Sequence, residues 1–439
     1  MAAGQAQASV FLFVNPTAGG QKGEKILQRL PHPFKVRLSD GKAVQVRAFS
    51  LKADGPYGKQ AGFAALKNEL KVTSYGMEAV RVIAAGGDGT IKWVVSEAKM
   101  QGIDPEQDLL FGILPLGTGN DFARSTGWGG KFPSRLLRDN LQNFSALVRN
   151  WCSAPSHTHD VWQVELRVDE NHGQIMVIND DKRRKERTAS NMLKEIMIMY
   201  FSIGQDARVG IGFDKYRTSN RLCNLCVYFW EGIKKAIPCR EKHRIGDVLY
   251  GLYHGTSSAG AVVFDTIPDS DAPCLVSNPQ LLAITNIASY GGGTANFWKS
   301  ASRVAVTRPV DDNLLDTDQD PGDGRLEVVT IRNLPTVVFD YAAQKVHRLG
   351  PKRVFSGAPL FLDFVEGEGE DDLLSYCQID GQYFKLVNPD SVCITFKFKL
   401  RVLYNPNEEA YDEDSSDESG SESDEAYGQW ENGHTSHKG

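Results

Sequence analysis

The sequence contains little cysteine, only seven residues in a chain of 439. An odd number of scattered cysteines in a chain this long does not make a disulfide framework. Cys223 and Cys226 form a lone C-x-x-C pair in an apolar run, and no second pair completes a zinc site. We therefore expect reduced core thiols and no zinc.

Long apolar runs are also missing. No stretch approaches the roughly 20 apolar residues that span a bilayer, and the N-terminus lacks the basic start of a signal peptide. Glycine stands at position 4 and not 2, and the C-terminal residues 436–439 contain no prenylation signal. The sequence therefore predicts a cytoplasmic protein that associates with membranes only peripherally.

The common nucleotide-binding motifs are absent as well. The chain has no G-x-x-x-x-G-K-[ST], because residues 19–25 do not fit that pattern. It also lacks the His-Arg-Asp and Asp-Phe-Gly motifs of protein kinases and the G-x-G-x-x-G turn of dinucleotide enzymes. These absences exclude three large classes of nucleotide enzymes.

Negative charge is concentrated in one segment. The net charge is −6, and residues 408–425 alone hold ten Asp or Glu and no Lys or Arg, which leaves +4 on the rest. We expect residues 406–439 to form a disordered acidic tail. A mildly basic body suits an anionic cofactor or an anionic membrane surface, and we expect no nucleic-acid partner.

The first part of the chain alternates strand and helix patterns. Buried strands are predicted at 10–14, 44–49, 80–85 and 109–114, and helices at 23–30, 60–70 and 91–98. Strand, glycine turn and helix in repeated order are typical of a parallel sheet with crossover helices. We expect an α/β nucleotide-binding catalytic domain over residues 8–150.

The pattern changes after residue 150. Period-two or β-branched segments predict strands at 161–168, 174–178, 196–203, 281–287, 302–306, 326–331 and 392–403, and one helix is predicted at 219–236. We expect residues 151–405 to form a mainly antiparallel, β-sandwich-like domain. Its last strands either stay there or return to the first domain.

Three glycine-rich turns each follow a predicted strand and precede a predicted helix: 15–20, 86–90 and 117–121. Glycine lets a backbone approach a ligand closely, and turn amides at a helix N-terminus bind phosphate. Asp88 and Asp121 add carboxylates at the same sheet edge. The chemistry is that of a phosphate-binding enzyme, although tight turns that only close a doubly wound sheet would share the pattern.

Longer segments carry a family resemblance. Gly86–Thr90 is similar to the nucleotide turn shared by diacylglycerol, sphingosine and ceramide kinases. Four longer segments resemble the eukaryotic diacylglycerol kinases in particular: 113–124, 128–130, 200–207 and 286–293. Two more, 323–329 and 378–381, follow in the family's order. The resemblance implies a two-domain lipid-kinase fold. The Cys/His-rich zinc modules of many animal members are missing.

The resemblance implies transfer of the γ-phosphoryl group of ATP to the primary hydroxyl of 1,2-diacylglycerol, giving phosphatidic acid, with Mg²⁺ as cofactor. Such transfer depends on positioning and charge neutralisation. Asp88 would orient or deprotonate the lipid hydroxyl, or else only fix its own turn. The nucleotide would be held by Asn15, Gly19, Gly20, Gly86, Gly87, Gly89, Thr90, Gly117, Thr118, Gly119, Asn120, Arg217 and Arg221.

Four more acids receive roles from the resemblance. Asp121 contacts substrate or metal, or instead caps the following helix. Asp206 reaches the lipid headgroup, and Asp323 holds a structural Mg²⁺ or simply belongs to an Asp-Gly turn. Asp380 is a second catalytic residue. The family usually continues its Asp-Gly with Glu, but this chain has Gln382, which cannot act as a base.

The lipid partner implies contact with an anionic membrane surface. Candidate basic segments are 182–187 and 234–244, while protein partners are not specified by the sequence. A ceramide or sphingosine kinase is an alternative enzyme, although residues 113–130 argue against it. A regulator that binds lipid and nucleotide without catalysis is an alternative from another class, suggested by Gln382.

Overall fold

The computed structural model describes residues 8–72, 80–133, 135–178, 185–187, 190–216, 244–267, 269–293, 296–332, 350–367 and 372–406. Several predicted features lie outside these residues: Arg217, Arg221, the helix at 219–236, the C-x-x-C pair and most of the acidic tail. Within the described part, no helix is long and apolar enough to cross a membrane.

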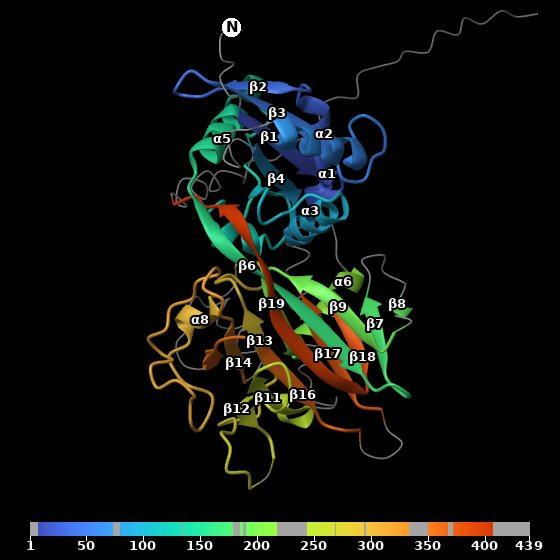
Figure 1. The fold of residues 1–439 in the computed structure, drawn as a ribbon, viewed down its shortest axis with the longest axis vertical. Coiled ribbons are helices and arrows are strands. Elements are labelled where there is room, and N and C mark those ends of the chain that lie inside the picture. The colour runs from blue at the N-terminus through green and yellow to red at the C-terminus, as the bar shows by residue number, and fades with distance from the viewer. Residues whose placement is uncertain are drawn as a thin grey trace, which may run out of the picture.

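The N-terminal region is an α/β layer (Figure 1). Its strands are β1 Ala8–Val14, β2 Phe34–Arg37, β3 Ala43–Ser50, β4 Val80–Gly86 and β5 Leu110–Pro115. Its helices are α1 Ala18–Arg29, α2 Lys59–Val72, α3 Asp88–Met100, α4 Asp121–Ser125, the short η2 Asp139–Leu141 and α5 Gln142–Ser153. All four predicted strands and all three predicted helices of this region are present, and β2 is an addition.

Strands β3, β1, β4 and β5 lie side by side and are parallel. Every residue of β4 and β5 is buried, which is the pattern of strands covered on both faces by crossover helices. Strand β2 pairs antiparallel with β3 at the outer edge. The sheet therefore has the doubly covered centre that the apolar runs predict.

The C-terminal region is mainly β. Its strands are β6 Ser156–Val168, β7 Gln174–Ile178, β8 Lys185–Arg187, β9 Met192–Met197, β10 Tyr200–Gly204, β11 Leu249–His254, β12 Ala261–Asp265, β13 Leu281–Thr285, β14 Glu327–Ile331, β15 Lys352–Ser356, β16 Leu360–Phe364, β17 Leu374–Ile379, β18 Gln382–Val387 and β19 Pro389–Leu403. Helical pieces are α6 Gln205–Tyr216, η3 Ile245–Asp247 and α8 Phe297–Ser300. An eight-stranded antiparallel sheet runs in the order β15-β14-β13-β10-β17-β18-β7-β8.

Two long strands connect the regions. Strand β19 pairs with β6 along most of its length, and the ribbon that they form runs from the β-rich region to the α/β region (Figure 1). At its far end β19 pairs in parallel with β5, through Arg401 opposite Leu110. Strand β19 thus extends the first sheet, which has eleven strands among the described residues.

An apolar core lies between the two sheets. It contains buried side chains from β6 and β19 of the larger sheet together with side chains from the eight-stranded sheet, among them Trp162, Leu166, Ile394, Phe201, Leu282 and Phe384. Two sheets that share one core make a sandwich. The expected fold, a parallel α/β domain followed by an antiparallel sandwich-like domain, is confirmed.

Two predicted strands differ from the structure. Residues 196–203 form parts of two strands, β9 and β10, because the amides of Ile198 and Met199 bond to a carboxylate and not to a neighbouring strand. Residues 302–306 form only isolated bridges, since Val304 and Val306 pair with different segments of the chain. In both places a partner distant in the sequence replaces the regular ladder that the alternation predicted.

Candidate active site

The three glycine turns lie together at the carboxyl ends of β1, β4 and β5. The strand ends are in register, with Val14 opposite Ala85 and Gly86 opposite Pro115. Main-chain bonds continue beyond the strands, from Asn15 N to the Ala85 carbonyl at 2.9 Å. Neighbouring parallel strands therefore bring the predicted phosphate turns to one sheet edge.

Glycine is required where these turns touch. A Cβ on Gly117 would lie 2.6 Å from the Cα of Gly87, and a Cβ on Gly19 would lie 2.6 Å from the Leu116 carbonyl oxygen. Gly19 also has a φ of +62°, in the region that favours glycine. The three turns pack backbone against backbone, which leaves their amides close to one another.

The first turn has the form of an anion-binding nest. Gly19, Gly20 and Gln21 are consecutive residues with left-handed backbone angles at the start of α1. The Asn15 side chain accepts a 3.0 Å bond from the Thr17 hydroxyl, which keeps the turn in shape. The structure thus places Asn15, Gly19 and Gly20 together, as the sequence predicted.

The third turn is shaped by Asn120. Its Oδ1 accepts a 2.9 Å bond from the Gly117 amide, and its Nδ2 donates to the carbonyls of Gly117 and Gly130 at 2.8 and 2.9 Å. Asn120 is itself left-handed, with a φ of 56°, and stands at the N-cap of α4. Its side chain is therefore committed to the turn, and Asp121 does not occupy the cap.

Asp88 is the first residue of α3 and is only partly buried. Its Oδ1 accepts a 3.1 Å bond from the Phe122 amide, while Oδ2 has no partner among the described residues. A Cβ on Gly119 would lie 3.3 Å from that Oδ2, so the free oxygen faces the third turn. Burial, reinforced by the nearby charge of Asp121, raises the pKa of Asp88 to about 7.

Asp121 reaches across to the β-rich region. Its carboxylate accepts bonds from the Ser289 hydroxyl at 2.6 Å, the Tyr200 hydroxyl at 3.1 Å, and the amides of Gly292 and Gly293 at 2.8 Å each. Only 1% of the residue is exposed. Both oxygens are satisfied, so Asp121 joins the two regions directly beside Asp88.

Asp380 is held in the same way by the main chain. It lies in the two-residue turn between β17 and β18, where Asp380 and Gly381 have φ values of 50° and 79°. Its carboxylate accepts the amides of Ile198, Met199 and Tyr200 at 2.7, 2.8 and 3.0 Å. Burial raises the pKa of Asp380. The carboxylate fixes the corner that carries Tyr200.

The pattern-breaking Gln382 directly follows this turn. It begins β18 and pairs with Ile379 across the hairpin. Asp380 is therefore placed by hairpin geometry and by the amides that it accepts, without any contribution from a charged residue at 382.

Asp206 lies deeper, and only 5% of it is exposed. Its Oδ2 accepts bonds from Ser202 and Tyr290 at 2.5 Å each and from Gln378 at 2.9 Å. Oδ1 is buried without a partner among the described residues, and burial raises the pKa of the carboxyl. The Tyr290 ring packs against that of Tyr200 at a tilt of 44°, with 4.5 Å between the ring centroids, and so links Asp206 to the site.

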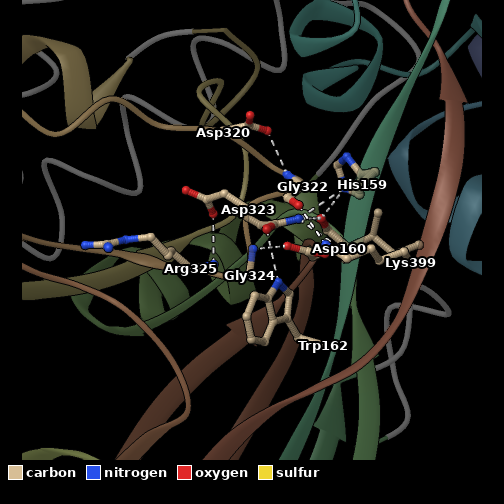
Figure 2. Close-up of polar contacts among 11 residues, drawn as sticks. His159, Asp160, Trp162, Asp320, Gly322, Asp323, Gly324, Arg325 and Lys399 are labelled. Carbon is tan, nitrogen blue, oxygen red and sulfur yellow. Dashed lines mark hydrogen bonds and ion pairs between the residues drawn. The ribbon is translucent and has the colours of Figure 1, made fainter.

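Asp323 lies apart from these residues, in a turn beside β6 and β19 (Figure 2). Its Oδ1 accepts a 2.9 Å bond from the Arg325 amide, as in an ordinary Asx turn. The buried acid nearby is Asp160, whose Oδ1 lies 2.7 Å from Lys399 Nζ, and the same ammonium donates to the Gly322 carbonyl at 2.7 Å. A cationic side chain thus already donates to the carboxylate and carbonyl oxygens beside this turn.

Known proteins match both regions. Residues 9–146 match the family model of the diacylglycerol kinase catalytic domain, and residues 196–383 match that of the diacylglycerol kinase accessory domain, about three quarters of the chain in all. The chain belongs to the diacylglycerol kinase family. Eye-specific diacylglycerol kinase of Drosophila melanogaster is 27% identical over 318 residues, which cover 70% of this chain and 18% of the relative.

Other members align over more of their length. Diacylglycerol kinase 4 of Arabidopsis thaliana is 26% identical over 408 residues, 86% of this chain and 77% of that protein. The chain therefore spans less than a fifth of the fly diacylglycerol kinase but most of the plant one. A diacylglycerol kinase structure from Bacillus anthracis str. Sterne aligns over 92% of this chain and 98% of its own, with 14% identity and a TM-score of 0.42.

Sequence reasoning gave no roles to several residues of this family member's site. Ser289, Gly292 and Gly293 form a fourth glycine turn, and a Cβ on Gly292 would lie 3.3 Å from the Cα of Gly119. The signal was present in the three successive glycines at 291–293, all with positive φ. In the sequence these residues carry only the family resemblance of segment 286–293, although the turn does lie between a strand, β13, and a helix, α8.

Proposed function

We propose that this chain is an ATP-dependent diacylglycerol kinase that transfers the γ-phosphoryl group to the primary hydroxyl of 1,2-diacylglycerol and forms phosphatidic acid. The observation that carries the proposal is the free Oδ2 of Asp88 at the rim of three glycine turns. Of the three carboxylates at the site, those of Asp121 and Asp380 are already bonded in full. Asp88 is then the group that orients or deprotonates the lipid hydroxyl.

The nucleotide phosphates fit the glycine turns. The nest at Gly19–Gln21 and the helix start behind Gly87 offer backbone N–H groups to an anion. A Cβ on Gly89 would meet no atom within 4 Å, so this glycine borders open space. Mg²⁺ would be carried with the phosphates, since it binds oxygen and keeps few protein ligands. Bound there, the ion neutralises phosphate charge.

The lipid side of the proposal concerns the predicted basic residues. Arg217, Arg221 and residues 179–184 lie outside them, so their contacts with phosphate or membrane stay predictions. Arg244, from the second predicted basic segment, donates to the Asn278 carbonyl at 2.7 Å. Because the substrate is a lipid, the enzyme would work from the cytoplasm as a peripheral membrane protein.

The decisive experiment supplies radiolabelled ATP and Mg²⁺ with diacylglycerol, ceramide or sphingosine in mixed micelles. Labelled phosphatidic acid that disappears with Asp88→Asn is the expected result. Label on ceramide or sphingosine would favour the alternative enzymes. ATP binding without turnover on any of the lipids would mean that the chain is a regulator.

Gln382 motivates the regulator as a second candidate. Gln382→Glu restores the acid that the family usually has after its Asp-Gly. If the chain is a regulator that lost catalysis through this change, Gln382→Glu creates phosphatidic acid synthesis where the natural chain has none. If the chain is a working kinase, the natural glutamine already supports turnover and the variant has a measurable starting rate.

A further inference from the structure

Lys92 connects the helix of the nucleotide turn to the β-rich region. It lies on α3 one helical turn after Asp88, on the same face of the helix. Its Nζ lies 2.6 Å from Glu195 Oε2 on β9, and the atom is closed off from solvent. The two side chains are 16% and 24% exposed. This ion pair crosses between regions that meet at the site.

Glu195 stands close to the corner that Asp380 anchors. Strand β9 ends at Met197, and the next two amides, of Ile198 and Met199, donate to the Asp380 carboxylate. The Lys92 ammonium also opposes the burial effect on the pKa of Asp380 by lowering it. Lys92 therefore influences this corner both through Glu195 and through its field.

The local charge balance makes the lysine important. Asp88, Asp121 and Asp380 bring three carboxyl groups to one site, and none of them forms an ion pair within the described residues. A catalytic site that must also receive an anionic nucleotide gains from a positive charge fixed on the helix that carries Asp88. The Lys92 ammonium is largely buried, and the Glu195 carboxylate beside it compensates for part of its lost hydration.

We propose that Lys92 is a positioning residue for phosphoryl transfer, whose ammonium must sit on α3, paired with Glu195, to hold the Asp88 helix against the corner anchored by Asp380. The inference rests on the proposed kinase function. It adds a residue to which neither the glycine motifs nor the carboxylates pointed.

Charge variants of the full chain test the role. Lys92→Met, Lys92→Arg, Glu195→Gln and the swapped pair Lys92→Glu with Glu195→Lys are compared for kcat, KM for ATP and Tm. Lys194→Met is the matched control, because Lys194 lies on the same strand and pairs with Glu165 at 2.8 Å within the β-rich region. We expect Lys92→Met to lower kcat about tenfold to 100-fold, and Lys92→Arg and Lys194→Met to keep it.

The swapped pair separates charge position from simple bracing. It restores an ion pair, so Tm should return towards the wild-type value, while kcat stays low because the ammonium now lies on β9. Recovery of kcat in the swapped protein, or an unchanged kcat in Lys92→Met, would overturn the proposal. Should the swapped protein not fold, Glu195→Gln decides: it keeps the helix charge and must lose less activity than Lys92→Met.

Failure of the proposed function would look different. If the wild-type chain phosphorylates no lipid, kcat cannot be compared, but the Tm values of the charge variants can still be measured. Coupling between Lys92 and Glu195, obtained from the Tm values of Lys92→Met, Glu195→Gln and the double variant that carries both changes, would still support the brace between α3 and β9. Additive Tm changes would refute it whatever the activity.

Discussion

The nucleotide side and the accessory side of the site are built by contacts of different range. On the nucleotide side, neighbouring parallel strands end in turns that touch through glycine, as at Gly87 and Gly117. On the accessory side, carboxylates bind segments distant in the chain, with Asp121 accepting the amides at 292–293 and Asp380 those at 198–200. The first side is preformed by its sheet, whereas the contacts of Asp121 on the second side form only when both regions are folded together.

The same comparison separates acids by role. Each carboxylate oxygen of Asp121 and Asp380 accepts a hydrogen bond, and these bonds join distant segments of the chain. Asp88, with one free oxygen and a pKa raised by burial to about 7, is available for chemistry. Three acids that look alike in the sequence thus divide into one with an unbonded oxygen, which we propose as the reactive group, and two whose oxygens bond other segments of the chain.

The largest effect is expected from Asp88→Asn. Loss of the group that orients or deprotonates the hydroxyl should lower kcat by roughly 100-fold to 10,000-fold. The fold should not suffer, because ionising a carboxyl whose pKa is raised from 3.8 to about 7 costs stability above pH 4, and Asn removes that cost. Lipid kinase assays check the loss of kcat, and thermal melts at pH 8 check that the fold keeps its stability.

The comparison fails if Asp88→Asn melts well below the wild type at pH 8. Asp88 would then be an anchor like the other two acids. Asp104→Asn, at an exposed loop residue, serves as the control for handling and expression.

The next largest effect is expected from Asp121→Asn. One carboxylate oxygen becomes an NH₂ group that meets N–H or O–H donors, from Gly292 or Tyr200. The change should cost about 3 kcal/mol of unfolding free energy and lower kcat by about 100-fold through misplacement of the accessory side. Activity and urea unfolding should fall together, unlike in Asp88→Asn. Lost activity with unchanged stability would instead assign Asp121 to the chemistry.

The sequence predicts the nucleotide side better than the accessory side because the contacts of the two sides differ in range along the chain. Apolar runs and glycine turns are local signals, and parallel strands necessarily bring the turns after β1, β4 and β5 to one edge. The bonds of Asp121 and Asp380 depend on partners 79 to 182 positions away, which no local pattern encodes. Lys92 was missed likewise, because its partner Glu195 lies on another domain.

A smaller effect is expected from pH. Asp88 must be ionised to act as a base, and with a pKa of about 7 its ionised fraction falls as pH drops from 8 to 6. The value of kcat/KM should therefore decline towards acid pH, by about tenfold per unit once below pH 7. Initial rates at low ATP between pH 5.5 and 8.5 measure this limb. A flat profile over that range would show that Asp88 is ionised throughout.

The smallest effect on catalysis is expected from Lys399→Met, which lies outside the site. The ammonium compensates the fully buried Asp160, so its loss leaves an unpaired charge and should cost about 3 kcal/mol of stability. Because neither the glycine turns nor the three site acids contact it, kcat below the melting temperature should stay near the wild-type value.

Melts with and without Mg²⁺ extend the test to the metal predicted at Asp323. Magnesium stabilisation of the wild type that is lost in Asp323→Asn would place an ion beside Lys399, whereas stabilisation confined to Lys399→Met would mean that the lysine normally fills the cation's place.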